Sequence, residues 1–385
     1  MARVWPEPMW HNLFYDLAYV AAILVLSSSF SFEYTVLNAI WIALVFSMLW
    51  SMWLVTSLVM NRMPVGPRRV WLVAVQMGFV LSAAVSAGGQ VAQTVELIGV
   101  LLGGGMLSVA ALVAVESRGE GSASGRVEIL LLVLAAGLFA SEWALPAFGF
   151  LVAWPLAIIL VIRVAIRFLR DGDESAHTFT HRFGELTMIV LGESFVKVGL
   201  ADDANGLNKF RIAALVLILV VITTVWWGYF GVIVRGDAGG SGRRRVMWAT
   251  LHVPLHLGLV FLSVGFAKLL ADSHALLHGG VAWLLLIPFV LVILSLAGLA
   301  LVGSGSAGQV AAEGLTGAAV LTVVVAVLTP RFEWLNPVLA TWCATVPFVG
   351  AIAFLHRRLA RRLGPGPAVA QAPDAAPTPS TSLEE

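Results

Sequence analysis

The feature that most constrains this chain is its series of apolar runs, each close to the length that a helix needs to cross a bilayer. A membrane-spanning helix uses about 20 residues to cross about 30 Å of hydrocarbon. Of the 385 residues, 59% are hydrophobic and only 12% are charged, whereas soluble domains carry about 25% charged residues. The sequence therefore predicts an all-α, polytopic membrane helix bundle.

The apolar runs predict about twelve transmembrane helices. They cover residues 11–31, 35–59, 70–88, 94–115, 127–145, 147–169, 183–201, 210–234, 246–270, 281–302, 313–329 and 335–356. The stretch 363–385 is rich in Pro, Ala, Ser and Thr without an apolar face, which predicts a disordered cytoplasmic tail.

Most of the 23 lysines and arginines fall on one side of these spans. The exceptions are Lys197, which lies inside a span, and four residues on the opposite side: Lys209, Arg211, Lys268 and Arg331. The positive-inside rule then predicts a multi-pass protein of the cytoplasmic (plasma) membrane with both termini in the cytoplasm. The net charge of +1 follows this topology and indicates no nucleic-acid partner. The single cysteine excludes an intrachain disulfide and a thiolate-rich metal site.

An offset of about 176 residues relates similar residues in the two halves of the chain. Asp16 corresponds to Glu193, Trp50 to Trp226, and Gln76 to His252. Six spans separate the copies, so the pattern predicts two parallel six-helix repeats, residues 1–176 and 177–362. The alternative is that arginines and tryptophans simply mark the ends of spans, as they do in many membrane proteins.

Ionisable side chains inside the spans are the first candidates for function. Placing one charge in the hydrocarbon costs about 2.5–3.5 kcal/mol, so each needs a partner, water or protonation. Asp16 is either a cavity-lining acid or the partner of Arg62 or Arg182. Glu193 is either a protonatable group near mid-bilayer or the i+4 partner of Lys197.

Histidines provide a second set of candidates. His181 and Glu185 are four residues apart, beside Arg182, and His252 and His256 repeat this spacing in the ninth span. Two histidines and two carboxylates are suitable ligands for zinc or iron, but the chain has no HExxH or paired ExxH motif. We therefore predict proton or substrate binding at these residues, without a metal or cofactor.

Four tryptophans are candidates for the aromatic wall of a cavity. They are Trp50, Trp53, Trp226 and Trp227. An aromatic wall facing the acids would suit a cationic or polyprenyl guest. Their alternative role is to anchor the helices at the membrane interface.

Three segments carry a resemblance to a known family. They are residues 12–20 (NLFYDLAYV), Arg182-Phe183-Gly184 continuing to Leu191-Gly192-Glu193-Ser194, and the span Trp248 to Lys268 with His252 near its start. In order and spacing they resemble the bacterial low temperature requirement A family across most of residues 9–360. The resemblance implies a polytopic inner-membrane protein of poorly defined activity, linked by name to growth in the cold.

The chain departs from the family's usual residues at several positions. Asn12 stands where the first signature usually has glutamate, and Glu185 stands at a usually apolar position. The second signature usually reads His, two residues, Glu-Arg, where this chain has Thr178 and His181-Arg182. An acid is thus lost at two positions and gained at one nearby, which predicts a specialised member.

Three functions fit these observations. The first is transport, in which Asp16 and Glu193 exchange protons or bind a cation at the interface of the repeats. The second is an intramembrane enzyme that acts on a lipid or isoprenoid, with Glu193 or Asp16 as acid and His181 or His252 as base. The third is a scaffold or sensor. Membrane lipids and an unknown small solute or lipophilic substrate are the expected partners.

Overall fold

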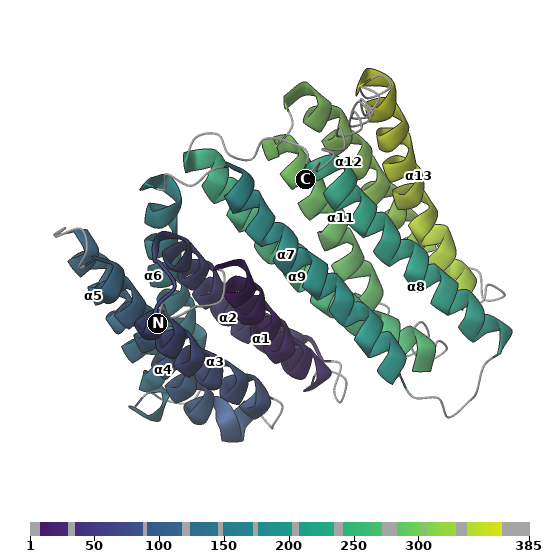
Figure 1. Ribbon diagram of the computed structural model, residues 1–385. Helices are drawn as coiled ribbons and strands as arrows, with labels where there is room; N and C mark the ends of the chain where they lie inside the picture. Colours follow the sequence, from purple (N-terminus) through teal and green to yellow (C-terminus); the bar gives the residue numbers. More distant parts are fainter. Residues whose placement is uncertain are drawn as a thin grey trace, which may run out of the picture.

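The computed structural model describes residues 8–29, 35–87, 91–117, 124–144, 149–171, 176–201, 208–234, 242–271, 283–303, 305–328 and 337–363. These residues form twelve α-helices and, within the described ranges, no strand (Figure 1). The predicted tail lies outside them, except for its first residue.

The helices follow one another along the whole described chain. They are α1 (Pro8–Ser29), α2 (Val36–Arg62), α3 (Pro67–Ser86), α4 (Val91–Ser117), α5 (Ser124–Phe139), α6 (Phe150–Asp171), α7 (Ala176–Leu200), α8 (Lys209–Gly228), α9 (Gly242–Ala271), α11 (Trp283–Gly303), α12 (Gly305–Leu328) and α13 (Pro337–Leu363). A short 3-10 helix (Ala140–Ala144) follows α5, and a π-helix (Tyr229–Ile233) continues α8.

Local signals define several helix ends. The Thr35 side chain caps α2 by accepting a hydrogen bond from the Asn38 amide, and Asn208 caps α8 in the same way. Pro67 occupies the first turn of α3, where its missing N–H leaves no intrahelical bond unmade. Arg69 of α3 then donates to the carbonyls of Met60 and Met63 at the end of α2. This contact satisfies carbonyls that the helix end leaves without partners.

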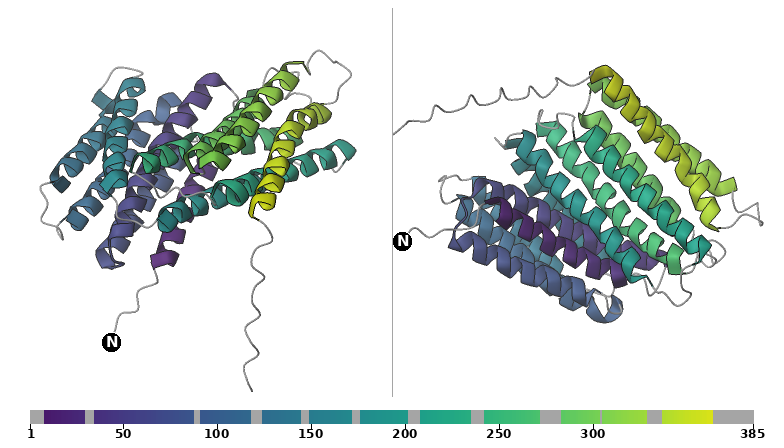
Figure 2. Two further views of the ribbon diagram at one scale, coloured as in Figure 1. Left: turned by 90° about the horizontal axis from the view of Figure 1, so that it is seen from above. Right: turned by 45° about the vertical axis from the view of Figure 1, so that its right-hand side comes forward.

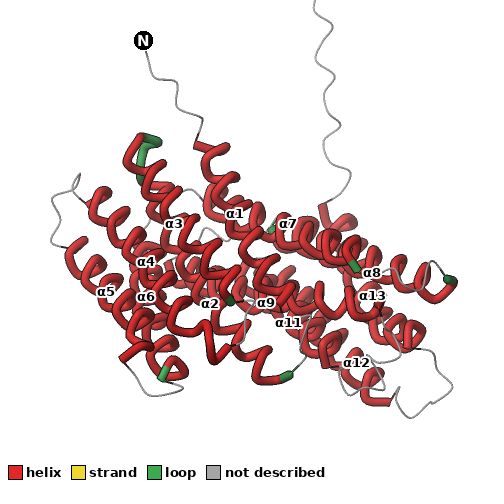
Figure 3. Tube along the Cα trace, turned by 90° about the horizontal axis from the view of Figure 1, so that it is seen from below, coloured by secondary structure: helices red, strands yellow, loops and turns green. Residues whose placement is uncertain are grey.

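The helices form two groups that lie side by side (Figures 1 and 2). In the first group α3, α4, α5 and α6 pack in sequence, while α1 packs on α3 and α2 on α6. In the second group α9, α11, α12 and α13 pack in sequence, while α7 packs on α9 and α8 on α13. Contacts of α1 with α7 and of α6 with α9 join the groups. The view from below shows α1 beside α7 (Figure 3).

The outer faces of the bundle are apolar. Large exposed hydrophobic side chains include Phe14, Trp71, Val152 and Leu200. Exposed apolar surface on this scale is rare on monomeric soluble proteins, whereas lipid tails cover it at little cost. Both the core and the outside thus fit a membrane helix bundle.

Ten of the twelve described helices are long and apolar enough to cross a membrane. The exceptions are α5, which has 16 residues and is about 24 Å long, and α7, which carries Glu185 and Glu193 in its central part and Lys197 in its last turn. All twelve predicted spans coincide with a helix, but α7 begins at Ala176 and α12 at Gly305, earlier than predicted. Their first turns are polar or small, so hydropathy does not reveal them.

Candidate functional site

The candidate site lies along the contact between α1 and α7, where the two groups of helices meet. Asp16 on α1 contacts Arg182 on α7, and Ser27 on α1 contacts Glu193 on α7. Both pairs are separated by 166 residues in the chain, so the two helices run parallel. The two polar levels are about 16 Å apart at 1.5 Å per residue. Asp16 and Glu193, predicted as equivalent positions of two repeats, therefore lie at different levels of this interface.

The first level is a buried ion pair. Asp16 has 0% of its surface exposed, and both of its oxygens accept hydrogen bonds from the Arg182 guanidinium at 2.9 Å. Trp53 Nε1 also donates to Asp16 Oδ1 at 2.8 Å, and Arg182 donates to Ser57 Oγ at 3.1 Å. The expected pairing of Asp16 with a loop-proximal arginine is present, with Arg182 as the partner. This bidentate pair fixes helix positions, while the buried Arg182 Nε has no hydrogen-bond partner.

A side branch of the first level leads to the surface. Arg182 also donates to Glu185 Oε2 at 3.2 Å, and Glu185 Oε1 lies 3.4 Å from His181 Nδ1. The His181 side chain is 54% exposed. Arg62, the alternative partner of Asp16, instead donates to the Phe168 carbonyl and faces Glu116 at 4.0 Å. The structure therefore brings His181, Arg182, Glu185 and Asp16 into one chain of polar contacts.

The second level holds a carboxylate with incomplete hydrogen bonding. Glu193 is 3% exposed, and its Oε1 accepts a hydrogen bond from Ser27 Oγ at 2.7 Å. Its Oε2 is buried and has no hydrogen-bond partner. Lys197, also buried, donates to Ser28 Oγ at 3.4 Å and forms no ion pair with Glu193 in the described structure. The two charges of the predicted i, i+4 pair interact electrostatically beyond 4.0 Å, and their hydrogen bonds go from α7 to the serines at the end of α1.

The two histidines of α9 belong to the core between α2, α7 and α9. His256 Nδ1 accepts a hydrogen bond from Trp50 Nε1 at 3.1 Å, and its Nε2 lies 2.9 Å from Thr187 Oγ1. Because the Thr187 hydroxyl donates to the Phe183 carbonyl, we assign the proton of His256 to Nε2. This assignment describes a neutral ring with both nitrogens bonded.

His252 is equally enclosed. Its Nδ1 lies 2.7 Å from the Trp248 carbonyl, which only accepts, so Nδ1 carries the proton. Its Nε2 then accepts from the Tyr229 hydroxyl at 2.7 Å. Tyr229 is the first residue of the π-helix that continues α8, a distortion that often accompanies functional or packing constraints. In the described part of the chain, no three His, Cys, Asp or Glu residues are placed to hold a metal ion.

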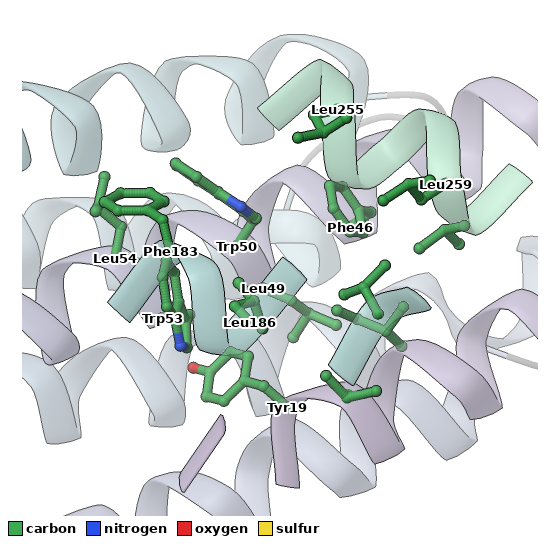
Figure 4. Close-up of a cluster of buried hydrophobic side chains, with 14 of the residues drawn as sticks. Tyr19, Phe46, Leu49, Trp50, Trp53, Leu54, Phe183, Leu186, Leu255 and Leu259 are labelled. Atoms are coloured by element: carbon green, nitrogen blue, oxygen red, sulfur yellow. The ribbon is translucent and has the colours of Figure 1, made fainter. Parts of the chain in front are cut away.

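The aromatic residues divide into an inner and an outer set. Trp50, Trp53 and Phe183 gather between α2 and α7, as Figure 4 shows. Trp226, in contrast, is 44% exposed, and Trp227 stacks on His356 of α13. The structure therefore does not bring the four candidate tryptophans together, because α8 turns Trp226 toward the outer face and Trp227 toward α13.

Sequence reasoning missed the hydroxyl groups that complete the site. Ser27, Ser57 and Thr187 each contact a predicted site residue. A run of three serines, residues 27–29, at the end of an apolar span was the available signal for Ser27. For Ser57 and Thr187 the sequence offers none, because isolated hydroxyl residues occur along many helices, where they bond their own backbone.

The comparison with known families places the whole helix bundle in one family. Residues 9–353 match the model of the family described as bacterial low temperature requirement A protein (LtrA). The chain belongs to the LtrA family. No curated protein and no solved structure matches it.

The segments that resemble the two LtrA signatures are the ones that meet at the α1–α7 contact. Two of the departures from the usual LtrA residues lie on these two helices, although Asn12 bonds α3 and not α7. Asn12 accepts a hydrogen bond from Arg69 at 2.7 Å, and Glu185 contacts Arg182 one turn from the position where an acid is usual. Arg182 of this LtrA protein therefore contacts two carboxylates, Asp16 and Glu185.

Proposed function

We propose that this LtrA-family protein is a proton- or cation-coupled transporter of the plasma membrane, with Glu193 as the group that takes up and releases the proton or cation. The observation that carries the proposal is the hydrogen bonding of Glu193: one oxygen is bound by Ser27 and the other is buried without a partner. An unsatisfied carboxylate oxygen in an apolar interior costs several kcal/mol. A bound proton lowers that cost by removing the charge, and a bound cation would supply the missing partner.

Ser27 is suited to both forms of Glu193. Its single hydroxyl proton has two acceptors within reach, Glu193 Oε1 at 2.7 Å and the Leu24 carbonyl at 3.1 Å. When Glu193 is ionised, Ser27 donates to it. When Glu193 is protonated, Ser27 donates to Leu24 and accepts from the acid instead. The proton can therefore come and go without leaving a hydroxyl unbonded.

Two parallel six-helix repeats, with both termini in the cytoplasm, form the framework of the proposal. It is supported by the parallel α1 and α7 and by the order of packing, in which α7–α13 reproduces the contacts of α1–α6. Gln76 of α3 bonds Thr56 of α2, and His252 of α9 bonds Tyr229 at the end of α8. Sites in repeated transporters lie where such copies meet.

The complete hydrogen bonding of three buried candidates supports transport over acid catalysis; His181, which is 54% exposed, is not one of them. Asp16, His252 and His256 have their polar atoms bonded by protein groups, so none is free to transfer a proton to a substrate. We assign the Asp16–Arg182 pair a positioning role, as the fixed contact about which the two repeats move.

The test uses purified protein in vesicles that contain a pH-sensitive dye. A potassium diffusion potential or a gradient of Na⁺, K⁺ or Mg²⁺ is imposed, and internal pH is followed. We expect protein-dependent proton movement in the native chain and its loss in Glu193→Gln, because the amide keeps the Ser27 contact but takes up no proton.

The matched control is Glu142→Gln. Glu142 is also buried with one unbonded oxygen, but it lies in the 3-10 helix after α5, away from the α1–α7 contact. We expect this variant to move protons at the native rate. Absence of proton movement in the native protein under every gradient, or native rates in Glu193→Gln, would contradict the proposal.

A further inference from the structure

An apolar groove lies on the outer surface between the start of α3 and the end of α4. Its volume is about 460 Å³, and it is lined by Pro67, Arg68, Trp71, Leu72, Ala111, Ala114 and Val115. Small-molecule sites in proteins typically have volumes of about 300–1,000 Å³. Apart from Arg68 the lining side chains are apolar, so the groove suits a hydrocarbon chain.

The charge at the rim of this groove is positive. Arg68 has no ion-pair or hydrogen-bond partner for its side chain among the described residues, and it is exposed. The nearest acid along α4, Glu116, already faces Arg62. The first turn of α3 adds to the positive potential, because the dipole of a helix places partial positive charge at its amino end. An anionic head at this end of the groove would meet a cation whose charge no protein group neutralises.

Trp71 marks the level of the membrane interface. It is 72% exposed, one turn from Arg68, and it lines the same groove. Exposed tryptophans settle at the level of lipid headgroups and the adjoining ester groups. Arg68 and Trp71 thus place the rim of the groove where a phosphate lies, with the apolar part of the groove extending toward the bilayer core.

From this geometry we infer a binding site for one anionic phospholipid. Its phosphate pairs with Arg68, its ester region contacts Trp71, and one acyl chain lies in the groove between α3 and α4. Charge complementarity at the rim distinguishes this occupant from a neutral lipid. The inference is independent of the proposed transport, because the groove lies on the outer surface of the first helix group.

Native mass spectrometry of the full chain tests the site. The protein is released from micelles that contain phosphatidylglycerol and phosphatidylethanolamine in equal amounts, and the bound lipids are counted. We expect one retained phosphatidylglycerol, with Arg68→Gln weakening its binding about fivefold, the typical contribution of one arginine at an anionic surface. Because Arg68 is exposed and unpaired, the substitution leaves folding unchanged.

Two further variants separate a specific site from general attraction. Arg163→Gln removes another exposed arginine, on α6 and outside the groove, and should leave lipid retention as in the native chain. Ala114→Trp fills the groove without a change of charge and should lower retention of both lipids. Equal retention of the two lipids, an equal effect of the two arginine substitutions, or dimers that form without lipid in place of a lipid-bound monomer would overturn the inference.

Discussion

The buried Asp16–Arg182 pair predicts a large and unequal response to its two single substitutions. Arg182→Gln leaves Asp16 fully enclosed with Trp53 as its only remaining donor. Loss of one partner of a buried pair costs about 3–5 kcal/mol of unfolding free energy. Asp16→Asn leaves Arg182 its contacts with Glu185 and Ser57, so we expect a smaller loss of about 2 kcal/mol.

The decisive variant combines both substitutions. Without either charge the interior holds two neutral amides, so the double variant should lose at least about 1 kcal/mol less than the sum of the single losses. Unfolding by SDS in mixed micelles, followed by circular dichroism, measures these free energies. Arg163→Gln is the control and should stay within about 0.5 kcal/mol of the native chain. A loss below about 1 kcal/mol for Arg182→Gln, or additive losses in the double variant, would refute the assignment of a coupled pair.

Two further predictions use the same unfolding assay. Trp50→Phe keeps a ring in the core but leaves His256 Nδ1 without a donor, so we expect a loss of about 1 kcal/mol, whereas Trp226→Phe on the outer face should have no measurable effect. Gly99→Ala places a Cβ 2.3 Å from the Phe139 carbonyl and should cost about 1–3 kcal/mol, because α4 and α5 must separate. Gly137→Ala meets no atom within 4 Å and should be neutral or slightly stabilising; a similar loss in both glycine variants would contradict the close approach.

The number and order of the helices could be predicted from the apolar runs in the sequence, because a helix that crosses a bilayer needs a long apolar segment. Hydropathy does not predict the polar turns of a helix that continue beyond the hydrocarbon, and α7 is an example. Its first turns contain polar residues up to Arg182, yet they continue the helix and bring Arg182 to Asp16. The arginine was foreseeable as a partner because membrane charges need one. Whether Asp16 pairs with Arg182 or with Arg62 depended on where α7 begins.

The orientation of side chains around each helix was harder to predict. An offset of 176 residues aligns Trp50 with Trp226, but one is buried against His256 and the other is exposed. A helix whose residues are apolar all round gives no periodicity from which to choose its inner face. The contact between Ser27 and Glu193 could not be predicted for the same reason, since neither α1 nor α7 has a polar stripe that points to the other helix.

The different hydrogen bonding of the two carboxylates at the α1–α7 contact argues for different roles. Asp16 is bonded by Arg182 and Trp53, so its charge is stabilised where it lies, and moving or neutralising it would break several contacts at once. Glu193 is bonded by Ser27 alone, with a buried oxygen left over. A glutamine would satisfy Ser27 without the cost of a buried charge, so the one structural reason for an acid at this position is the buried charge of Lys197, one turn away and beyond ion-pair distance. An acid is needed there if the missing partner is a proton or cation that arrives and leaves.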